Sequence, residues 1–334
     1  MSDAMVTTQT INHQPDGAPA STGRRIVTIL GRNSLWIALA VLMAILATVS
    51  EPFRNLANLQ NILAQNGIIG IVAIGMLVMM ISGGFDLSVG AVGSAVAVAT
   101  AFVSVQVGLP LAIGAGLLIG LVLGCVNGFI IARIGINAFI ATFALASIVT
   151  GILLVLTGGK SVVGRSPELQ AFAYGRFLGI PLLFWAFLVF AILTHVLLSR
   201  TKWGHWTYSA GANSHASYLS GVPVTMVRFT AFAFGGLAVG VGGVLLFGQS
   251  AIGQPTGAEA WPLSAIAICV IGGTSLNGGV GRVSNVIAAV LLLGVVGNGL
   301  NQLGVSPYWQ PAVTGAIILV AVIANQIGKA RQRN

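Results

Sequence analysis

Long apolar runs alternate with short polar segments along this chain from about residue 33 to residue 328. A helix needs roughly 20 apolar residues to cross the hydrocarbon core of a bilayer, so runs of this length predict membrane-spanning helices. One helix each is expected in 33–50, 55–85, 134–159, 177–199 and 229–258. The runs 87–132 and 283–328 are long enough for two helices each, divided by turn-forming sequences at 108–110 and 304–307.

The segment 260–281 is less regular, because it is apolar only from about 261 to 273. A full crossing there gives about ten helices, with both chain ends on the cytoplasmic side. The basic residues favour this layout, since it places 11 of the 15 in inner segments, as the positive-inside rule requires. The outer segments then hold only Arg54, Lys160, Arg165 and Arg176. Two re-entrant segments, near 82–88 and 261–273, would keep both chain ends on the cytoplasmic side as well, so this alternative stays open.

The composition agrees with this pattern. Hydrophobic residues make up 56% of the chain and charged residues 6%, far below the roughly 25% charged residues of soluble domains. The net charge of +9 does not indicate a nucleic-acid site, because the basic residues lie between apolar runs rather than in one patch. Residues 1–23 are polar without periodicity and predict a disordered cytoplasmic tail, followed by a transmembrane domain over 24–334. The fold class is therefore an all-α integral membrane protein.

Few side chains within the apolar runs can do chemistry. Glycines recur every fourth residue at Gly116, Gly120, Gly124 and Gly128, which predicts close helix packing. Asp86 is the one acidic residue that lies between two apolar runs outside the tail and the outer segments. It can act as a substrate or proton site, or as a cap for the helix that begins at Leu87, and the position directly before an apolar helix favours the cap.

Neutral polar side chains offer a path for a hydroxyl-rich solute. Asn127, Asn298, Asn301 and Gln302 lie within or at the ends of long apolar runs, where amides can exchange hydrogen bonds with a sugar. Hydrogen bonding between helices explains the same residues equally well. We expect no catalytic residues and no metal ligands, because an intramembrane aspartyl protease needs two carboxylates and the histidines lack ligand spacing.

Four motifs resemble signatures of the permeases of ribose-type ABC sugar importers. They are 81–90 (Ile-Ser-Gly-Gly-Phe-Asp-Leu-Ser-Val-Gly), 128–136 (Gly-Phe-Ile-Ile-Ala-Arg-Ile-Gly-Ile), 272–282 (Gly-Gly-Thr-Ser-Leu-Asn-Gly-Gly-Val-Gly-Arg) and 298–310 (Asn-Gly-Leu-Asn-Gln-Leu-Gly-Val-Ser-Pro-Tyr-Trp-Gln). The resemblance covers about residues 35–328. The chain departs from it at Pro262-Leu263-Ser264, where the family usually shows Glu-Leu-Asp.

The resemblance implies a multi-pass subunit of the bacterial inner membrane that translocates a pentose or hexose. It implies three partners: a cytoplasmic ABC ATPase that holds ATP and magnesium, a periplasmic sugar-binding protein, and a second permease subunit, identical or different. This chain would carry no cofactor and would not itself be an enzyme. An ion-coupled secondary transporter of a small polar solute is the alternative. An inverted repeat of helices 2–5 and 7–10 is also expected, from a weak echo of Gly83-Gly84 in Gly272-Gly273.

The inner segment between Arg200 and Arg228 is the natural docking surface for such an ATPase. Within it the sequence predicts a short helix with Asn213 as N-cap and Gly221 as stop. This is similar to the coupling helix of the family. The expected coupling residues are Gly211, Asn213, Ala216, Tyr218, Leu219, Ser220 and Gly221. We expect Tyr218 and Leu219 to fill an apolar groove of the partner.

Overall fold

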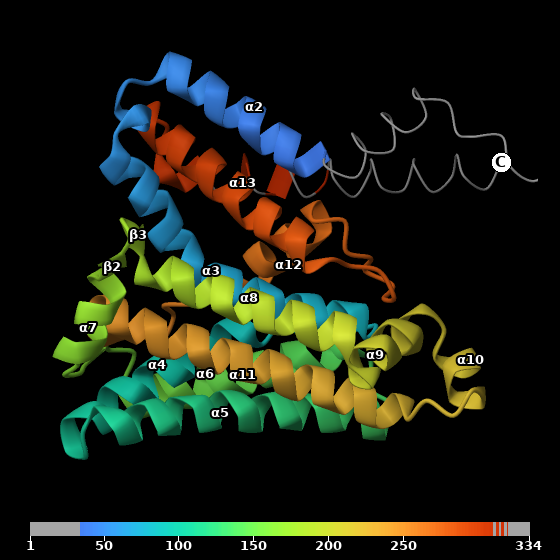
Figure 1. Ribbon diagram of the computed structural model, residues 1–334. Helices are drawn as coiled ribbons and strands as arrows, with labels where there is room; N and C mark the ends of the chain where they lie inside the picture. Colours follow the sequence, from blue (N-terminus) through green and yellow to red (C-terminus); the bar gives the residue numbers. More distant parts are fainter. Residues whose placement is uncertain (1–33, 310–311, 314, 317–318, 320–334) are drawn as a thin grey trace, which may run out of the picture.

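The computed structural model describes residues 34–309 together with 312–313, 315–316 and 319 of the 334-residue chain. Helices that run side by side form the body of the molecule (Figure 1). Within the described residues, seven helices are long and apolar enough to cross a membrane. They are α3 (Leu56–Ile81), α4 (Val89–Gln106), α5 (Leu109–Phe129) continued by the π-helix η2 (Ile130–Ile134), α6 (Ala138–Thr157), α8 (Leu182–Arg200), α11 (Val224–Ser250) and α13 (Val283–Gln302).

Two apolar helices are shorter, α2 (Ser34–Val49) and α12 (Trp261–Ile271). Together these helices account for most of the predicted spans. The tail 1–23 and most of the last predicted span lie outside the described residues, so the count of ten helices stays a prediction.

Small elements mark the two ends of the bundle (Figure 1). One end, called here the α7 end, carries α7 (Pro167–Tyr174) and two antiparallel pairs, β1 (Val162–Val163) with β4 (Ile252–Gly253) and β2 (Arg176–Phe177) with β3 (Ile180–Pro181). The other, the α10 end, carries α9 (Lys202–Ala212) and α10 (Ser214–Leu219). The 3-10 turns η1 (Pro52–Arg54) and η3 (Pro307–Trp309) follow α2 and α13 along the chain.

Helix α3 lies at the centre of the bundle. Every residue from Gly70 to Ile81 is buried, because α8, α11, α12 and α13 all pack against it. A helix that is apolar on all sides is typical of such a central position, since it has no face for water. The most extensive helix–helix contact within the described residues joins α5 to α11, and α4 packs against both of them.

The glycine stripe of α5 packs against α11, as the sequence predicted. All four glycines are buried. A Cβ on Gly120 or Gly124 would lie 2.6 or 2.7 Å from backbone atoms at Gly236 of α11. Small residues therefore allow the two backbones to approach closely, which is a common way to join helices in a membrane.

The segment 260–281 forms only a short helix. Helix α12 has 11 residues, and at 1.5 Å per residue it reaches about 16 Å, roughly half of a hydrocarbon core. The chain before it descends along α4: a Cβ on Gly253 would touch Val98, and the amide of Ala258 donates to Ser94 Oγ at 3.0 Å. This crossing of the bundle is therefore part turns and part helix, an arrangement tolerated in membrane proteins where the chain is buried or lines a cavity.

The two Gly-Gly sequences are also similar in structure, but the structure pairs Gly83 with Gly273 rather than with Gly272. Helices α3 and α12 end in the same motif, in which Gly83 and Gly273 have positive φ angles of 99° and 78°. The next amides, of Gly84 and Thr274, donate back to Met79 and Cys269 at 3.1 and 2.9 Å. These copies follow the second and eighth expected helices, whereas the inverted repeat would pair the second with the seventh. The repeat therefore stays a prediction without this support.

Candidate functional site

Asp86 and Asn127 come together at the α10 end of the bundle. Asp86 is 3% exposed and Asn127 is fully buried. The Asp86 carboxylate accepts hydrogen bonds from the Ser88 amide and hydroxyl, both at 2.6 Å, and from Asn127 Nδ2 at 3.0 Å. Asn127 Nδ2 also donates to Ser88 Oγ at 2.9 Å. Helix α4 begins at Val89 with Ser88 as its N-cap, and no side chain caps it, so Asp86 is not the N-cap of a helix that begins at Leu87. Its carboxylate instead holds the turn directly before α4. A role of Asp86 or Asn127 in translocation is not tested by this geometry.

The other expected path residues lie on α13. Asn298 and Gln302 both donate to Asn58 Oδ1 of α3, at 2.8 and 2.9 Å, and Asn58 Nδ2 returns a bond to Asn298 Oδ1 at 2.9 Å. Asn301 is exposed on the same helix. The structure therefore divides the predicted path residues into two groups, and two of the α13 amides bridge α3 and α13.

A cavity with several polar side chains on a largely apolar wall lies between α4, α6 and the chain that leads into α12. Its volume is about 590 Å³, which is within the range of small-molecule sites. Its polar lining consists of Ser94, Ser147, Thr150, Thr256 and Glu259, set among Leu87, Phe143, Leu154, Pro255, Pro262 and small residues of α4 and α6. Lys and Arg are absent from its lining among the described residues. Hydroxyl groups and one carboxylate on an apolar wall suit a neutral, hydroxyl-bearing solute.

Sequence reasoning did not find this cavity. Glu259 was assigned to an outer segment, and Ser147, Thr150 and Thr256 were not singled out. The signal that could have found them is the interrupted apolar run at 260–281, because broken helices line solute sites in many transporters. Leu87 links this cavity to the Asp86 cluster, since it lines the cavity and its amide bonds to Thr142 Oγ1 at 3.1 Å.

The predicted short helix near Asn213 is present as α10. Asn213 is its N-cap, with Oδ1 accepting from the Ala216 amide at 3.0 Å, and the Ser220 hydroxyl bonds back to the Ala216 carbonyl at 2.9 Å. The chain leaves the helix at Gly221, whose φ is +81°. The sequence treated 200–228 as a loop, and this was wrong for its first half, which forms α9. Gly211 accordingly belongs to α9 rather than to the short helix.

Helix α10 presents an apolar surface. Tyr218 is 70% exposed and Leu219 is 72% exposed. Tyr218 also borders an apolar pocket of about 370 Å³ formed with Phe129, Met226 and Phe229. Two large exposed side chains on a capped helix fit a helix that docks in a groove of another protein.

A chain of tight contacts joins α10 to the start of α4. Gly211, at the end of α9, packs on the carbonyl of Ile81 at the end of α3. Arg228 Nε donates to the Ser82 carbonyl at 3.3 Å, four residues before Asp86. These contacts hold α9 and α11 against the segment that leads from α3 to Asp86.

These features are typical of a transport protein: many apolar helices, a half-length helix that borders a solute-sized cavity, and a short helix with exposed apolar side chains at one end. Residues 58–322 match the family model described as the branched-chain amino acid transport system / permease component. The ribose import permease protein of Escherichia coli K12 is 36% identical over 328 residues, covering 96% of this chain and 99% of the relative.

Other relatives extend the comparison. The L-arabinose transport system permease protein of Escherichia coli K12 is 35% identical, covering 95% of this chain and 97% of the relative. The ribose import permease protein of Bacillus subtilis is 37% identical, covering 87% of this chain and 91% of the relative. No solved structure matches the chain. The chain belongs to this family of transport permeases and is a multi-pass membrane protein.

Proposed function

We propose that this chain is the membrane-spanning permease subunit of an ATP-binding-cassette importer and that it translocates a pentose or hexose. The observation that carries the proposal is the similarity, over nearly the whole length of both chains, to permeases named for ribose and L-arabinose. The cavity beside α12 supplies the chemistry, since Ser and Thr hydroxyls and the Glu259 carboxylate can replace a sugar's hydration water.

The family description names branched-chain amino acids, which form a second substrate class. An amino acid zwitterion carries a carboxylate, and burying it requires a cation or several donors. The described lining of the cavity includes Glu259 and no Lys or Arg. Glu259 could pair with the ammonium group of the zwitterion, but no cation in the described lining could pair with its carboxylate, so the cavity favours a neutral sugar over a zwitterion.

The proposal includes partners on both sides of the membrane. With the α10 end in the cytoplasm, α10 docks on an ABC ATPase, which binds ATP and magnesium on its own chain. A periplasmic sugar-binding protein delivers the solute at the α7 end, in the inner membrane of a bacterium. A second permease subunit faces this one. In α5 and in α6 only 22% of the apolar stretch is buried, which leaves apolar surface for lipid or for that subunit.

An ion-coupled carrier is the competing function. Such carriers use intramembrane acids or half-helix sites to couple an ion. Asp86 is already held by three hydrogen bonds to Ser88 and Asn127. One relative, from Azospirillum brasilense, is named an L-arabinose ABC transporter permease protein. These observations favour an ATP-driven subunit.

Uptake of labelled solutes tests the proposal. The gene for this chain would be deleted in its native host, and whole cells or sealed membrane vesicles assayed for labelled ribose, arabinose and leucine, with the gene restored on a plasmid as control. We expect one sugar's uptake to depend on the chain and on ATP, and to persist when ion gradients are collapsed by an ionophore. Loss of uptake on adding the ionophore at constant ATP supports the ion-coupled carrier, and loss of leucine uptake alone supports the other substrate class.

A further inference from the structure

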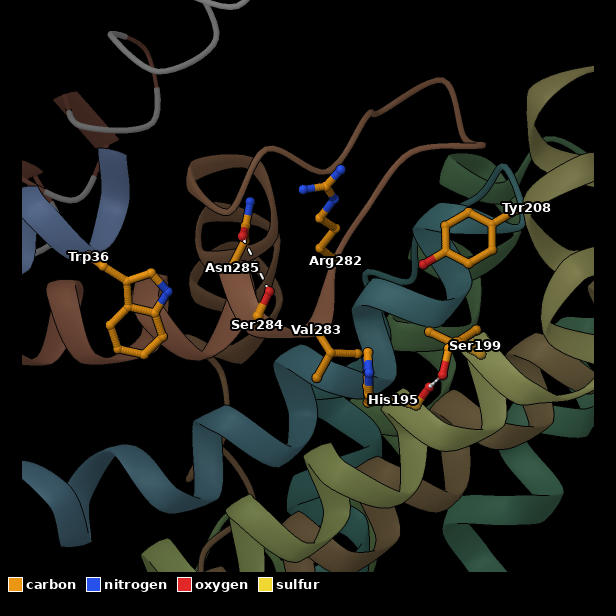
Figure 2. A pocket seen from close by; sticks show the side chains of 9 residues that line it. Trp36, His195, Ser199, Tyr208, Arg282, Val283, Ser284 and Asn285 are labelled. Carbon is orange, nitrogen blue, oxygen red and sulfur yellow. Dashed lines mark hydrogen bonds between the residues drawn. The ribbon is translucent and has the colours of Figure 1, made fainter. Parts of the chain in front are cut away.

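A second polar cavity lies at the α10 end, away from the cavity beside α12. Its volume is about 480 Å³, and it is lined from four helices: Trp36 of α2, His195 and Ser199 of α8, Tyr208 of α9, and Ser284 and Asn285 of α13. Arg282, directly before α13, projects over it between Asn285 and Tyr208 (Figure 2). Donor groups thus converge on one space from helices that are far apart in the sequence.

The charge in this cavity is not balanced within it. None of its nine lining residues is acidic. Tyr208 is the one phenol among those lining residues; its hydroxyl donates to the Gly281 carbonyl at 2.9 Å, and burial raises the pKa of Tyr208 although the positive charge of Arg282 opposes this. A phenol in its neutral form does not compensate the guanidinium. The cavity therefore carries a net positive charge and several hydrogen-bond donors.

The cavity also lies at a defined depth. Helix α8 ends at Arg200, one residue beyond Ser199, and α13 begins at Val283. Two apolar helices therefore start or stop around the cavity, at the level where a hydrocarbon core meets the headgroups. Trp36, 40% exposed at its rim, is of the residue type that favours this interface.

We propose that this cavity binds the phosphate group of an anionic phospholipid. Arg282 provides the charge and Asn285 Nδ2 a further donor for phosphate oxygens, while Trp36 borders the glycerol and upper acyl chains. The Ser199 and Ser284 hydroxyls donate to the His195 carbonyl at 2.7 Å and to Asn285 Oδ1 at 3.4 Å, and would turn from these acceptors to the phosphate. Basic pockets between helix ends at a membrane surface are known to hold anionic headgroups. A planar guanidinium suits this role because it donates two parallel hydrogen bonds to phosphate. The lipid would tie α2 and α13 to α8 and α9, next to the docking helix α10.

Lipid retention by the full chain tests the proposal. The purified protein in detergent is incubated with equal amounts of phosphatidylglycerol and phosphatidylcholine, and retained lipid is counted by native mass spectrometry. We expect about fivefold enrichment of phosphatidylglycerol, as one basic contact near a membrane surface provides. Arg282→Gln should abolish the enrichment, and Arg282→Lys should keep part of it. Arg133→Gln, which removes an exposed charge at the same end outside this cavity, is the matched control and should leave it unchanged.

The location is tested by fluorescence. Phosphatidylglycerol with brominated acyl chains should quench Trp36, so wild type should lose more emission than Trp36→Phe, and this difference should vanish in Arg282→Gln. If Arg282→Gln does not fold by circular dichroism and gel filtration, Asn285→Ala serves instead, with an expected loss of about half the enrichment. Equal binding of the two lipids by wild type, or enrichment that survives Arg282→Gln, overturns the proposal.

A free phosphate compound is the other source of the same chemistry. Millimolar inorganic phosphate added to lipid-depleted protein should not raise its thermal midpoint if the ligand is a lipid. A rise in wild type that is absent in Arg282→Gln, without enrichment of phosphatidylglycerol, would assign the cavity to a soluble phosphate and overturn the lipid assignment.

Discussion

Gly211 of α9 lies directly on the backbone carbonyl of Ile81, the last residue of α3. A Cβ on Gly211 would overlap the Ile81 oxygen and would approach the amide of Gly279 to 2.6 Å. The same Ile81 oxygen accepts a hydrogen bond from the Gly279 amide at 2.9 Å. Three segments, helix α9, the central helix α3 and the link before α13, therefore meet at one backbone contact that only glycine permits.

The first prediction concerns this contact. Gly211→Ala should lower the thermal midpoint in detergent, because rigid backbone cannot yield to the added methyl group, and overpacking of this kind costs about 1–3 kcal/mol. Gly114→Ala is the control: it is also a helical glycine, but nothing lies within 4 Å of the position that its new methyl group would occupy. We expect the control to leave the midpoint unchanged or raise it slightly. Equal midpoints for the two variants would contradict the tight contact.

The second prediction concerns Asp86. Asp86→Asn should keep expression and most uptake, because the carbonyl oxygen of the substituted asparagine can still accept from Ser88. Its new amide would face the Asn127 amide, and a flip of Asn127 lets Asn127 Oδ1 accept from it, at the cost of the present bond from Asn127 Nδ2 to Ser88 Oγ. Asp86→Ala should remove the acceptor that holds the turn before α4 and leave buried donors of Ser88 and Asn127 unpaired, at a cost of roughly 1–3 kcal/mol.

Labelled-sugar uptake and the amount of folded protein separate the two interpretations of Asp86. A well-folded Asp86→Asn protein with no transport would show that the negative charge itself is required, and would restore Asp86 as a substrate or proton site. Asn127→Leu tests the same cluster from the other helix and should resemble Asp86→Ala in stability.

The third prediction concerns the docking helix. Leu219→Asp should weaken co-purification of the ATPase about 10- to 100-fold, as expected when a leucine that becomes buried is replaced by a charge. Membrane insertion and thermal stability should not change, because Leu219 is 72% exposed. Leu178→Asp is the matched control: Leu178 is 79% exposed in the β2–β3 turn at the opposite end. Normal co-purification and uptake with Leu219→Asp would remove α10 from the ATPase interface.

Local patterns predicted much of the fold. Apolar runs located the long helices, and the Asn213 cap with Gly221 located α10, since each depends on residues close in sequence. What could not be predicted depends on distant contacts. Asp86 meets Asn127 across 41 positions, and Asn58 meets Asn298 across 240. The descent of 251–260 along α4 depends on Ser94 and Gly93 of another helix, so the cavity lining stayed hidden although the interrupted run was visible.

The fourth prediction concerns the cavity beside α12. Thr150→Val removes a hydroxyl at nearly constant volume, and loss of one hydrogen bond to a sugar should raise the KM for uptake about 3- to 10-fold. Thr157→Val is the same change on α6 outside this cavity, where the hydroxyl bonds only within the helix, to the Leu153 carbonyl. Its KM should match wild type. Equal KM values for both variants would place the solute elsewhere.

The last prediction distinguishes a bridge from a path at Asn298. If Asn58 and Asn298 chiefly bind each other, their single alanine variants should each destabilise the protein, and the double variant should cost less than the sum. The expected coupling is about 0.6 to 1.7 kcal/mol, the range found for hydrogen bonds between membrane helices. Thermal or denaturant unfolding in detergent measures this coupling, with uptake assayed in parallel.

Asn58 is 8% exposed, so it is poorly placed to touch a solute directly. A bridge therefore predicts that Asn58→Ala and Asn298→Ala reduce uptake only as far as they reduce folded protein. Additive stability effects, together with a rise in KM for Asn298→Ala alone, would instead assign Asn298 to the solute path.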